Sequence, residues 1–181
     1  MTALGFKEKW IAAAVVKRWL EFDSEKLEAA PVNHATKDFL KIGFASSGAP
    51  FVNFNNDLLS LSDYYGYDHP GNRYLVLGTD GGGNPICFDT DNNDIIVLLD
   101  HEQAFELMGT MNKNISELAE CLLLYRGFIS KVQAENGEDA FLDGDITDEQ
   151  IASLKEGLLN VNANIFTESD FWRNEVEYVR G

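Results

Sequence analysis

The spacing of hydrophobic positions changes along the chain from a helical period to a strand period and back. A stripe of apolar side chains at helical spacing predicts an amphipathic, core-facing helix over residues 4–22. The stripe consists of Leu4, Ile11, Val15, Trp19 and Phe22. Asn33 then stands where a helix over residues 35–42 needs an N-cap, and Gly43 follows at the position beyond the helix end that favours glycine. The chain therefore opens with helices.

Short runs rich in β-branched and aromatic residues follow, separated by clusters of Gly, Asn and Asp. The runs are residues 51–54, 74–77, 86–88 and 95–99. The connecting segments 78–84 and 90–94 contain residues that accept a positive φ or bond their own backbone, as hairpin loops require. This pattern predicts an antiparallel meander, and residues 105–111 are expected to add a further strand.

The helical period returns after the strands. Asn114 and Glu117 have the spacing of a capping box and predict a helix of about four turns. An acidic loop over 135–146 comes next, after which Thr147 and Gln150 repeat the capping pattern at the start of a second helix. The C-terminal part of the chain is therefore expected to be helical, like the N-terminal part.

A last helix is predicted over residues 167–178. The order helices, strands, helices predicts the α+β class, as one domain over residues 1–181 with a mainly antiparallel or mixed central sheet packed by N- and C-terminal helices. The sequence contains no run of about 18 apolar residues, so we expect no membrane span. The first residues lack the apolar centre of a signal peptide, which favours a cytoplasmic protein.

Charge is unevenly distributed along the chain. Its 181 residues include 30 Asp and Glu against 14 Lys and Arg, a formal net charge of -16. Residues 1–43 are nearly neutral, whereas residues 135–150 hold seven carboxylates and no Lys or Arg. Contacts with phosphate need clustered basic side chains, so nucleic acid and anionic membranes are not expected partners. The charge favours a basic protein partner, or else serves solubility.

Two segments imitate ligand-binding loops. The glycine-rich segment 78–83 leads into a strand rather than a helix and lacks the lysine of a phosphate loop. The segment that begins at Asp89 starts like a calcium loop, but it has neither the glycine at the sixth position nor the glutamate at the twelfth. We therefore expect turns here, with no cofactor and no metal.

Histidines and cysteines give no sign of catalytic chemistry either. His34, His69 and His101 have no pair at metal-ligand spacing on one element. Cys87 and Cys121 lie in apolar stretches, which predicts buried and inert thiols. The protein is therefore not expected to be an enzyme, and no catalytic residue is assigned.

Four segments share one order of strand, turn and cap signals. They are residues 36–43 before the first strand, 74–78 before a glycine turn, 86–89 before a polar turn and a strand ending near Asp100, and 111–118 at the start of the long helix. In this order and spacing the chain resembles the SUKH superfamily, bacterial immunity proteins related to the yeast cell-wall synthesis regulator and to Syd. The resemblance covers roughly residues 33–130, leaving helical extensions at both ends.

The resemblance implies an α+β domain that binds a protein and has no common catalytic residues. Bacterial members of the superfamily neutralise protein toxins of polymorphic toxin–immunity systems, often nucleases or deaminases. We accordingly expect an immunity protein that covers the active site of a cognate, basic toxin. The eukaryotic relatives leave a second hypothesis open, a non-catalytic regulatory or scaffold domain related to the cell-wall synthesis regulators.

Exposed carboxylates in loops are where groups that steer a basic partner would lie. The expected partner-binding residues are Asp80, Asp91, Asp94 and Glu102. A second set falls on the motif positions of the resemblance and is expected to have turn or cap roles. It consists of Gly78, Gly81, Asp89, Asn114 and Ser116.

Overall fold

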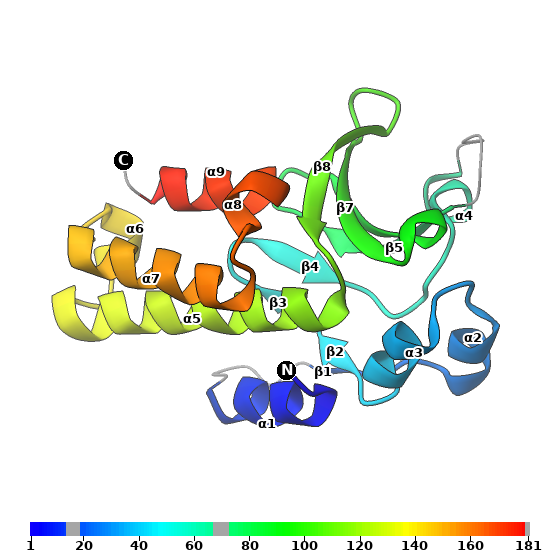
Figure 1. Ribbon diagram of the computed structural model, residues 1–181, viewed down its shortest axis with the longest axis horizontal. Coiled ribbons are helices and arrows are strands. Elements are labelled where there is room, and N and C mark those ends of the chain that lie inside the picture. Colours follow the sequence, from blue (N-terminus) through cyan, green and yellow to red (C-terminus); the bar gives the residue numbers. More distant parts are fainter. Residues whose placement is uncertain (14–18, 67–72, 180–181) are drawn as a thin grey trace.

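The computed structural model describes residues 1–13, 19–66 and 73–179 and has the predicted α+β class (Figure 1). Its centre is a six-stranded antiparallel sheet whose strands neighbour one another in chain order, which confirms the meander. The strands are β3 (Ser47–Gly48), β4 (Val52–Phe54), β5 (Tyr74–Thr79), β6 (Pro85–Asp89), β7 (Ile95–Asp100) and β8 (Glu106–Asn112). A separate two-stranded ribbon pairs β1 (Trp19–Leu20) with β2 (Phe44–Ala45).

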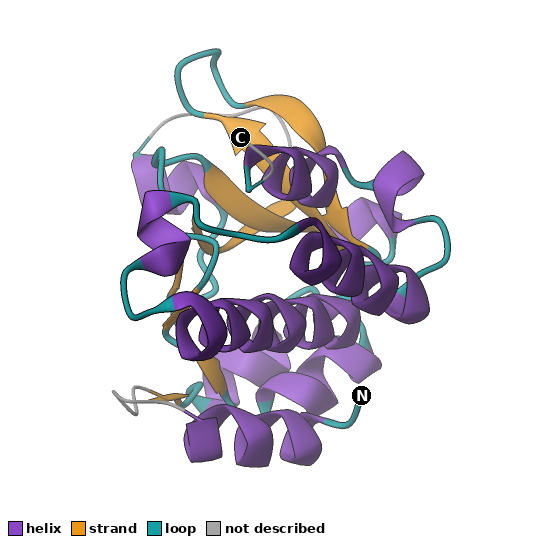
Figure 2. Ribbon diagram, turned by 90° about the vertical axis from the view of Figure 1, so that its left-hand side faces the viewer, coloured by secondary structure: helices purple, strands orange, loops and turns teal. Residues whose placement is uncertain are grey.

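Helices cover both faces of the sheet. The helices are α1 (Ala3–Ala13), α2 (Ser24–Ala29), α3 (His34–Leu40), α4 (Leu61–Tyr65), α5 (Ile115–Asn136), α6 (Ala140–Asp143), α7 (Asp148–Val161), α8 (Ile165–Glu168) and α9 (Asp170–Tyr178). Figures 1 and 2 show α5 between α1 on one side and α7 on the other. The short helices α2 and α4 were not predicted, because each has too few residues for a period to be recognised.

The core has two parts, one on each face of the sheet. On one face, Phe88 and Ile96 are buried in the same cluster as Leu122 of α5. On the other face, Val76 and Cys87 pack with residues of α4 and of the β7–β8 loop. Strands buried on both faces explain why the sequence runs here are continuously apolar rather than alternating.

The first helix differs from the prediction in its length and in its buried face. Phe6 and Trp10 are buried, whereas Leu4 is 56% exposed. Trp19 does not continue the helix but begins β1, where its indole N–H donates to the Ile42 carbonyl at 3.0 Å. The predicted stripe therefore lies on the wrong face of the helix. The local period could not show this, because the position of Trp19 depends on a contact with a distant segment. Val15 lies outside the described residues.

The caps predicted at the two asparagines, Asn33 and Asn114, are present. The Asn33 side chain accepts from the Thr36 N–H at 3.0 Å and begins α3, and Gly43 follows with a φ of 97°. The Asn114 side chain accepts from the Glu117 N–H at 2.9 Å and begins α5. Since α5 has 22 residues, it is about six turns long rather than four.

The C-terminal helices follow the prediction with one interruption. Thr147 and Gln150 form the complete capping box of α7. The helix expected over 167–178 is divided into α8 and α9 at Ser169, whose hydroxyl accepts from the Trp172 N–H at 3.3 Å. The acidic loop over 135–146 is shorter than expected, because α5 extends to Asn136 and α6 forms within it.

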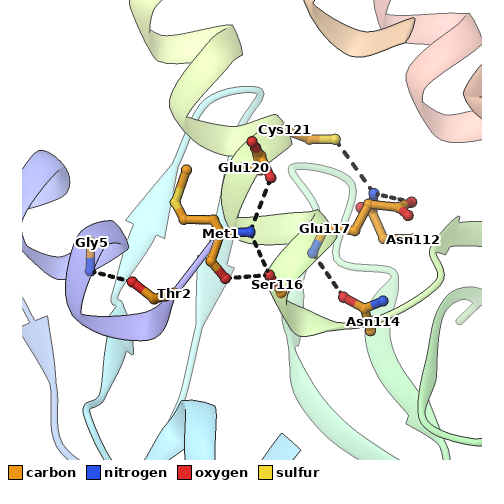
Figure 3. A network of polar contacts seen from close by, with 9 residues as sticks. All are labelled: Met1, Thr2, Gly5, Asn112, Asn114, Ser116, Glu117, Glu120 and Cys121. Atoms are coloured by element: carbon orange, nitrogen blue, oxygen red, sulfur yellow. Dashed lines mark hydrogen bonds and ion pairs between the residues drawn. The ribbon is translucent and has the colours of Figure 1, made fainter. Parts of the chain in front are cut away.

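Ser116 has a tertiary role rather than a cap role. Its hydroxyl donates to the Met1 carbonyl at 2.7 Å, and the Met1 ammonium donates to the Ser116 hydroxyl at 3.2 Å (Figure 3). The same ammonium lies 3.4 Å from a carboxylate oxygen of Glu120. These contacts hold the start of the chain against the first turn of α5.

Candidate protein-docking surface

The four carboxylates expected to contact a partner lie at opposite ends of the sheet. In an antiparallel meander, successive turns alternate between the two ends of the sheet. The length of β6 places these two ends about 17 Å apart. Asp80 and Glu102 belong to the turns at one end, which touch where the His101 ring nitrogen Nδ1 and Asn84 Oδ1 lie 2.8 Å apart. Asp91 and Asp94 belong to the β6–β7 turn at the other end. The four therefore do not form one patch.

Asp94 is not an exposed steering group, and this part of the prediction is wrong. Its side chain is buried, and its Oδ2 accepts from the Asn33 N–H at 2.7 Å and from the Thr36 hydroxyl at 2.8 Å. The carboxylate thus joins the β6–β7 turn to the first turn of α3. Asp91, three positions earlier, is exposed.

Asp80 closes its own turn and still faces the surface. Its Oδ1 accepts from the N–H groups of Gly82 and Asn84, at 2.9 and 2.8 Å. Glu102 is exposed in the neighbouring β7–β8 loop. Of the four predicted carboxylates, these two lie in turns that touch, and Asp80 also lines a hollow described below.

Besides Ser116, two of the residues expected in turns or caps have other roles. Gly78 lies inside β5 at a register shift, where a Cβ would be 2.0 Å from the Asn53 carbonyl oxygen, so only glycine allows this approach of β4. Asp89 is buried at the end of β6, and its Oδ2 lies 3.3 Å from Arg73 Nη2. Its role is an ion pair rather than a cap.

Gly81 is in a turn, as predicted, and packs against Phe51. A Cβ on Gly81 would lie 3.0 Å from the Cβ of Phe51. Phe51 itself has a φ of 44°, in the left-handed region, which costs an L-residue with a bulky side chain about 1–2 kcal/mol. Residues held in such conformations persist where the surroundings determine them, and they cluster at functional positions.

Three adjoining hollows share Phe51 in their lining, and we call them together the Phe51 groove. The first, of about 340 Å³, lies between α9, β8 and the β5–β6 turn. The second, of about 270 Å³, lies between α6 and the end of α9. The third, of about 280 Å³, lies between α6, α5 and the β3–β4 turn. The side of the molecule with α6 and the end of α9 faces the viewer in Figure 2.

Exposed apolar side chains stand along the groove. Phe51 is 66% exposed, Leu142 of α6 is 75% exposed and Tyr178 at the end of α9 is 78% exposed. Met108 of β8 adds an exposed thioether in the first hollow. Large apolar side chains that gather around a hollow, rather than standing singly, mark an interaction surface.

Carboxylates surround these apolar side chains. Asp80, Asp170 and Glu175 line the first hollow and Asp143 lines the second. Among the described residues that line the three hollows, none is Lys or Arg. The groove thereby connects the acidic turn at Asp80 with the acidic segment 135–150, two parts of the chain whose proximity was unknown from the sequence.

Glu175 has the most perturbed carboxyl of the groove. Burial raises its pKa to about 7, against a smaller lowering effect of the Tyr125 hydroxyl, which donates to Oε2 at 3.4 Å. Asp170, in contrast to Glu175, has a cation beside it, because the guanidinium of Arg173 bonds its carboxylate. Sequence reasoning missed Glu175, since nothing near it in the chain shows that α5 and the β5–β6 turn lie beside it.

The described part of the chain also shows how possible metal ligands and the two cysteines are placed. Over residues 1–13, 19–66 and 73–179 no group of three His, Cys, Asp or Glu is placed to hold a metal ion. Burial raises the pKa of both Cys87 and Cys121, which keeps the thiols protonated. His69 lies outside the described residues. No helix among those described is long and apolar enough to cross a bilayer.

Comparison with known proteins adds no relative: no protein-family model, no curated protein and no solved structure matches the chain. The fold and the groove themselves define an α+β protein with an acidic, partly apolar surface.

Proposed function

We propose that the protein is a non-catalytic inhibitor that binds a basic protein toxin and covers the toxin's active site, as the immunity proteins it resembles do. The observation that supports this proposal is the Phe51 groove, with exposed apolar side chains at its centre and carboxylates around them. Buried aromatic anchors supply most of the affinity of a protein interface, while complementary charge sets the association rate and the specificity.

The charge of the groove suits the proposed targets. Enzymes that act on nucleic acids hold the phosphates with clustered Lys and Arg, so their substrate clefts are strongly positive. An acidic surface that enters such a cleft competes with nucleic acid for the same cations. Inhibition then needs no catalytic group, only a stable complex that excludes the substrate.

Co-production in bacteria tests the proposal. The chain is produced together with a candidate toxin domain from a neighbouring gene, in cells whose growth that domain arrests. We expect the wild-type chain to restore growth and Phe51→Ala to restore it poorly, because the anchor is lost. Leu4→Ala is the matched control, since Leu4 is equally apolar and 56% exposed but lies on α1, away from the groove.

The result that contradicts the proposal is persistent growth arrest although the wild-type chain is folded and abundant. A neighbouring gene for cell-envelope synthesis, together with a complex between its product and this chain, supports the regulatory or scaffold hypothesis instead.

A further inference from the structure

The first hollow of the Phe51 groove combines apolar walls with the carboxyl group of Glu175 in α9. Phe51, Leu98, Met108 and Phe171 contribute apolar surface to its lining, and Asp80 and Asp170 line it besides Glu175. Such a cavity, mostly apolar with a few polar groups that fix orientation, has the composition of a site for a side chain or a small ligand.

Glu175 has no cation beside it within the described residues. The titratable groups that act on its carboxyl are Tyr125 from α5 and Asp80 from the β5–β6 turn, and neither is positively charged at neutral pH. Asp170 of α9 lines the same hollow, and the cation Arg173 is bonded to Asp170. Among the described residues the carboxylate therefore loses hydration without gaining a counter-ion, which is an unfavourable state that a bound cation would relieve.

We propose that this cavity receives a lysine or arginine side chain of the partner protein, with Glu175 as the counter-ion. The apolar walls, which include the aromatic residues Phe51 and Phe171, contact the aliphatic part of the incoming side chain. The inference deepens the proposed function, since it rests on a protein partner that carries a positive charge.

Other occupants fit the cavity less well. A divalent cation requires several oxygen ligands, but Asp80 is engaged by the N–H groups of its turn and Asp170 by Arg173. A second copy of this chain would bring a formal net charge of -16 against another of -16. A cationic side chain satisfies both the Glu175 carboxylate and the apolar walls.

Binding of the cation is coupled to a proton. A positive charge next to Glu175 lowers the pKa of its carboxyl from the value of about 7 in the free protein. Only the ionised carboxylate pairs with the cation, so the affinity rises with pH through this range. With a pKa near 7, the affinity is expected to increase about tenfold between pH 6 and pH 8.

The test uses the full chain and N-acetyl-arginine amide as the probe. The carboxyl carbon of Glu175 is followed by NMR during a pH titration, without ligand, with N-acetyl-arginine amide and with the neutral N-acetyl-citrulline amide. We expect the arginine derivative to move the titration midpoint to lower pH and citrulline to leave it unchanged. The proposal would be overturned if the titration midpoint of Glu175 were the same with both compounds. It would also be overturned if Mg²⁺ alone, or a higher protein concentration alone, shifted this midpoint.

Two variants complete the experiment. Glu175→Gln retains the shape of the side chain and an oxygen for the Tyr125 hydroxyl, so it is expected to fold and to lose both arginine binding and its pH dependence. Glu177→Gln removes the same charge from an exposed position of α9 and is expected to bind like the wild type. Thermal unfolding shows whether both variants are folded. Equal arginine binding by the wild type and Glu175→Gln would also overturn the proposal.

Because this test contains no toxin, its outcome is separate from that of the growth experiment. Arginine binding without growth rescue would contradict the proposed function and leave the cavity assignment in place. Growth rescue without arginine binding would contradict the cavity assignment alone.

Discussion

Asp94 lies in a set of hydrogen bonds that joins the β6–β7 turn to α3, although its neighbours in the sequence resemble those of the exposed Asp91. Its contacts, the Asn33 N–H and the Thr36 hydroxyl, come from positions 61 and 58 residues away. A local pattern therefore predicted the turn correctly but not the burial of this carboxylate. The start of α3, which packs against the turn, determines which aspartate of the turn is buried.

Asp94→Ala is expected to lower the free energy of unfolding by about 2 kcal/mol, because the buried Thr36 hydroxyl and the part-buried Asn33 N–H lose their acceptor. Asp91→Ala, in the same turn, is expected to change it by less than about 0.5 kcal/mol. Urea unfolding of the two variants measures the difference. Equal midpoints would show that the Asp94 bonds contribute nothing to stability.

Glu175 affects stability as well as binding. The pKa of this carboxyl is about 7 in the folded protein against 4.5 for the ordinary value, so the folded state holds more protons between these two pH values. Its contribution to stability consequently falls as the pH rises from 4.5 to 7.

We expect Glu175→Gln to stabilise the protein by about 1–2 kcal/mol at pH 8, and by less at pH 5.5, because only the higher pH requires a desolvated charge in the wild type. Urea unfolding at the two pH values provides the measurement. A stability difference that is the same at both would show that Glu175 titrates normally.

Elements whose signals are local could be predicted from the sequence. The caps at Asn33, Asn114 and Thr147 depend on contacts within one turn, and the meander depends on runs and turns that follow one another. The ribbon of β1 and β2 could not be predicted, since two strands of two residues each carry no period. The face of α1 was misjudged for the related reason that its neighbours belong to distant segments.

Two glycines show that the effect of a Gly→Ala substitution on stability depends on the element in which the glycine lies. Gly78→Ala is expected to destabilise the protein by more than about 2 kcal/mol, because the added Cβ would lie 2.0 Å from a backbone oxygen of β4. Gly127 lies within α5 with nothing within 4 Å of its Cβ position, so Gly127→Ala is expected to stabilise by about 0.5–1 kcal/mol. Thermal unfolding would contradict this account if both changes had the same sign.

At the scale of the whole molecule, the acidic segments are neither one surface nor evenly scattered. Asp80 and Glu102 lie at the end of the sheet next to the groove, while Asp91 lies at the opposite end. The alternation of turns in a meander already implied this division, so it could have been predicted from the sequence. The groove could not, because Phe51, Leu142 and Tyr178 come from three segments far apart in the chain.

The two ends of the sheet should differ in their effect on association. The double variant Asp80→Asn, Glu102→Gln is expected to associate with the proposed toxin about threefold or more slowly at low salt, and its association rate is expected to depend less on salt. The reason is that steering charges are removed beside the proposed interface. Asp91→Asn with Glu8→Gln removes the same charge elsewhere and is expected to leave the rate nearly unchanged. Stopped-flow mixing of each variant with the toxin tests this, and equal rates for the two pairs would exclude steering by the groove end.

The most direct test of the Phe51 groove is amide hydrogen exchange of the chain, free and in complex with the proposed toxin. We expect the bound toxin to slow exchange in the segments that form the groove, which are residues 48–54, 78–84, 106–110, 140–146 and 170–179. Exchange in α1, α2 and α3 is expected to stay as in the free protein. Slowed exchange confined to α1, α2 and α3, with none in the groove segments, would contradict the assignment of this surface.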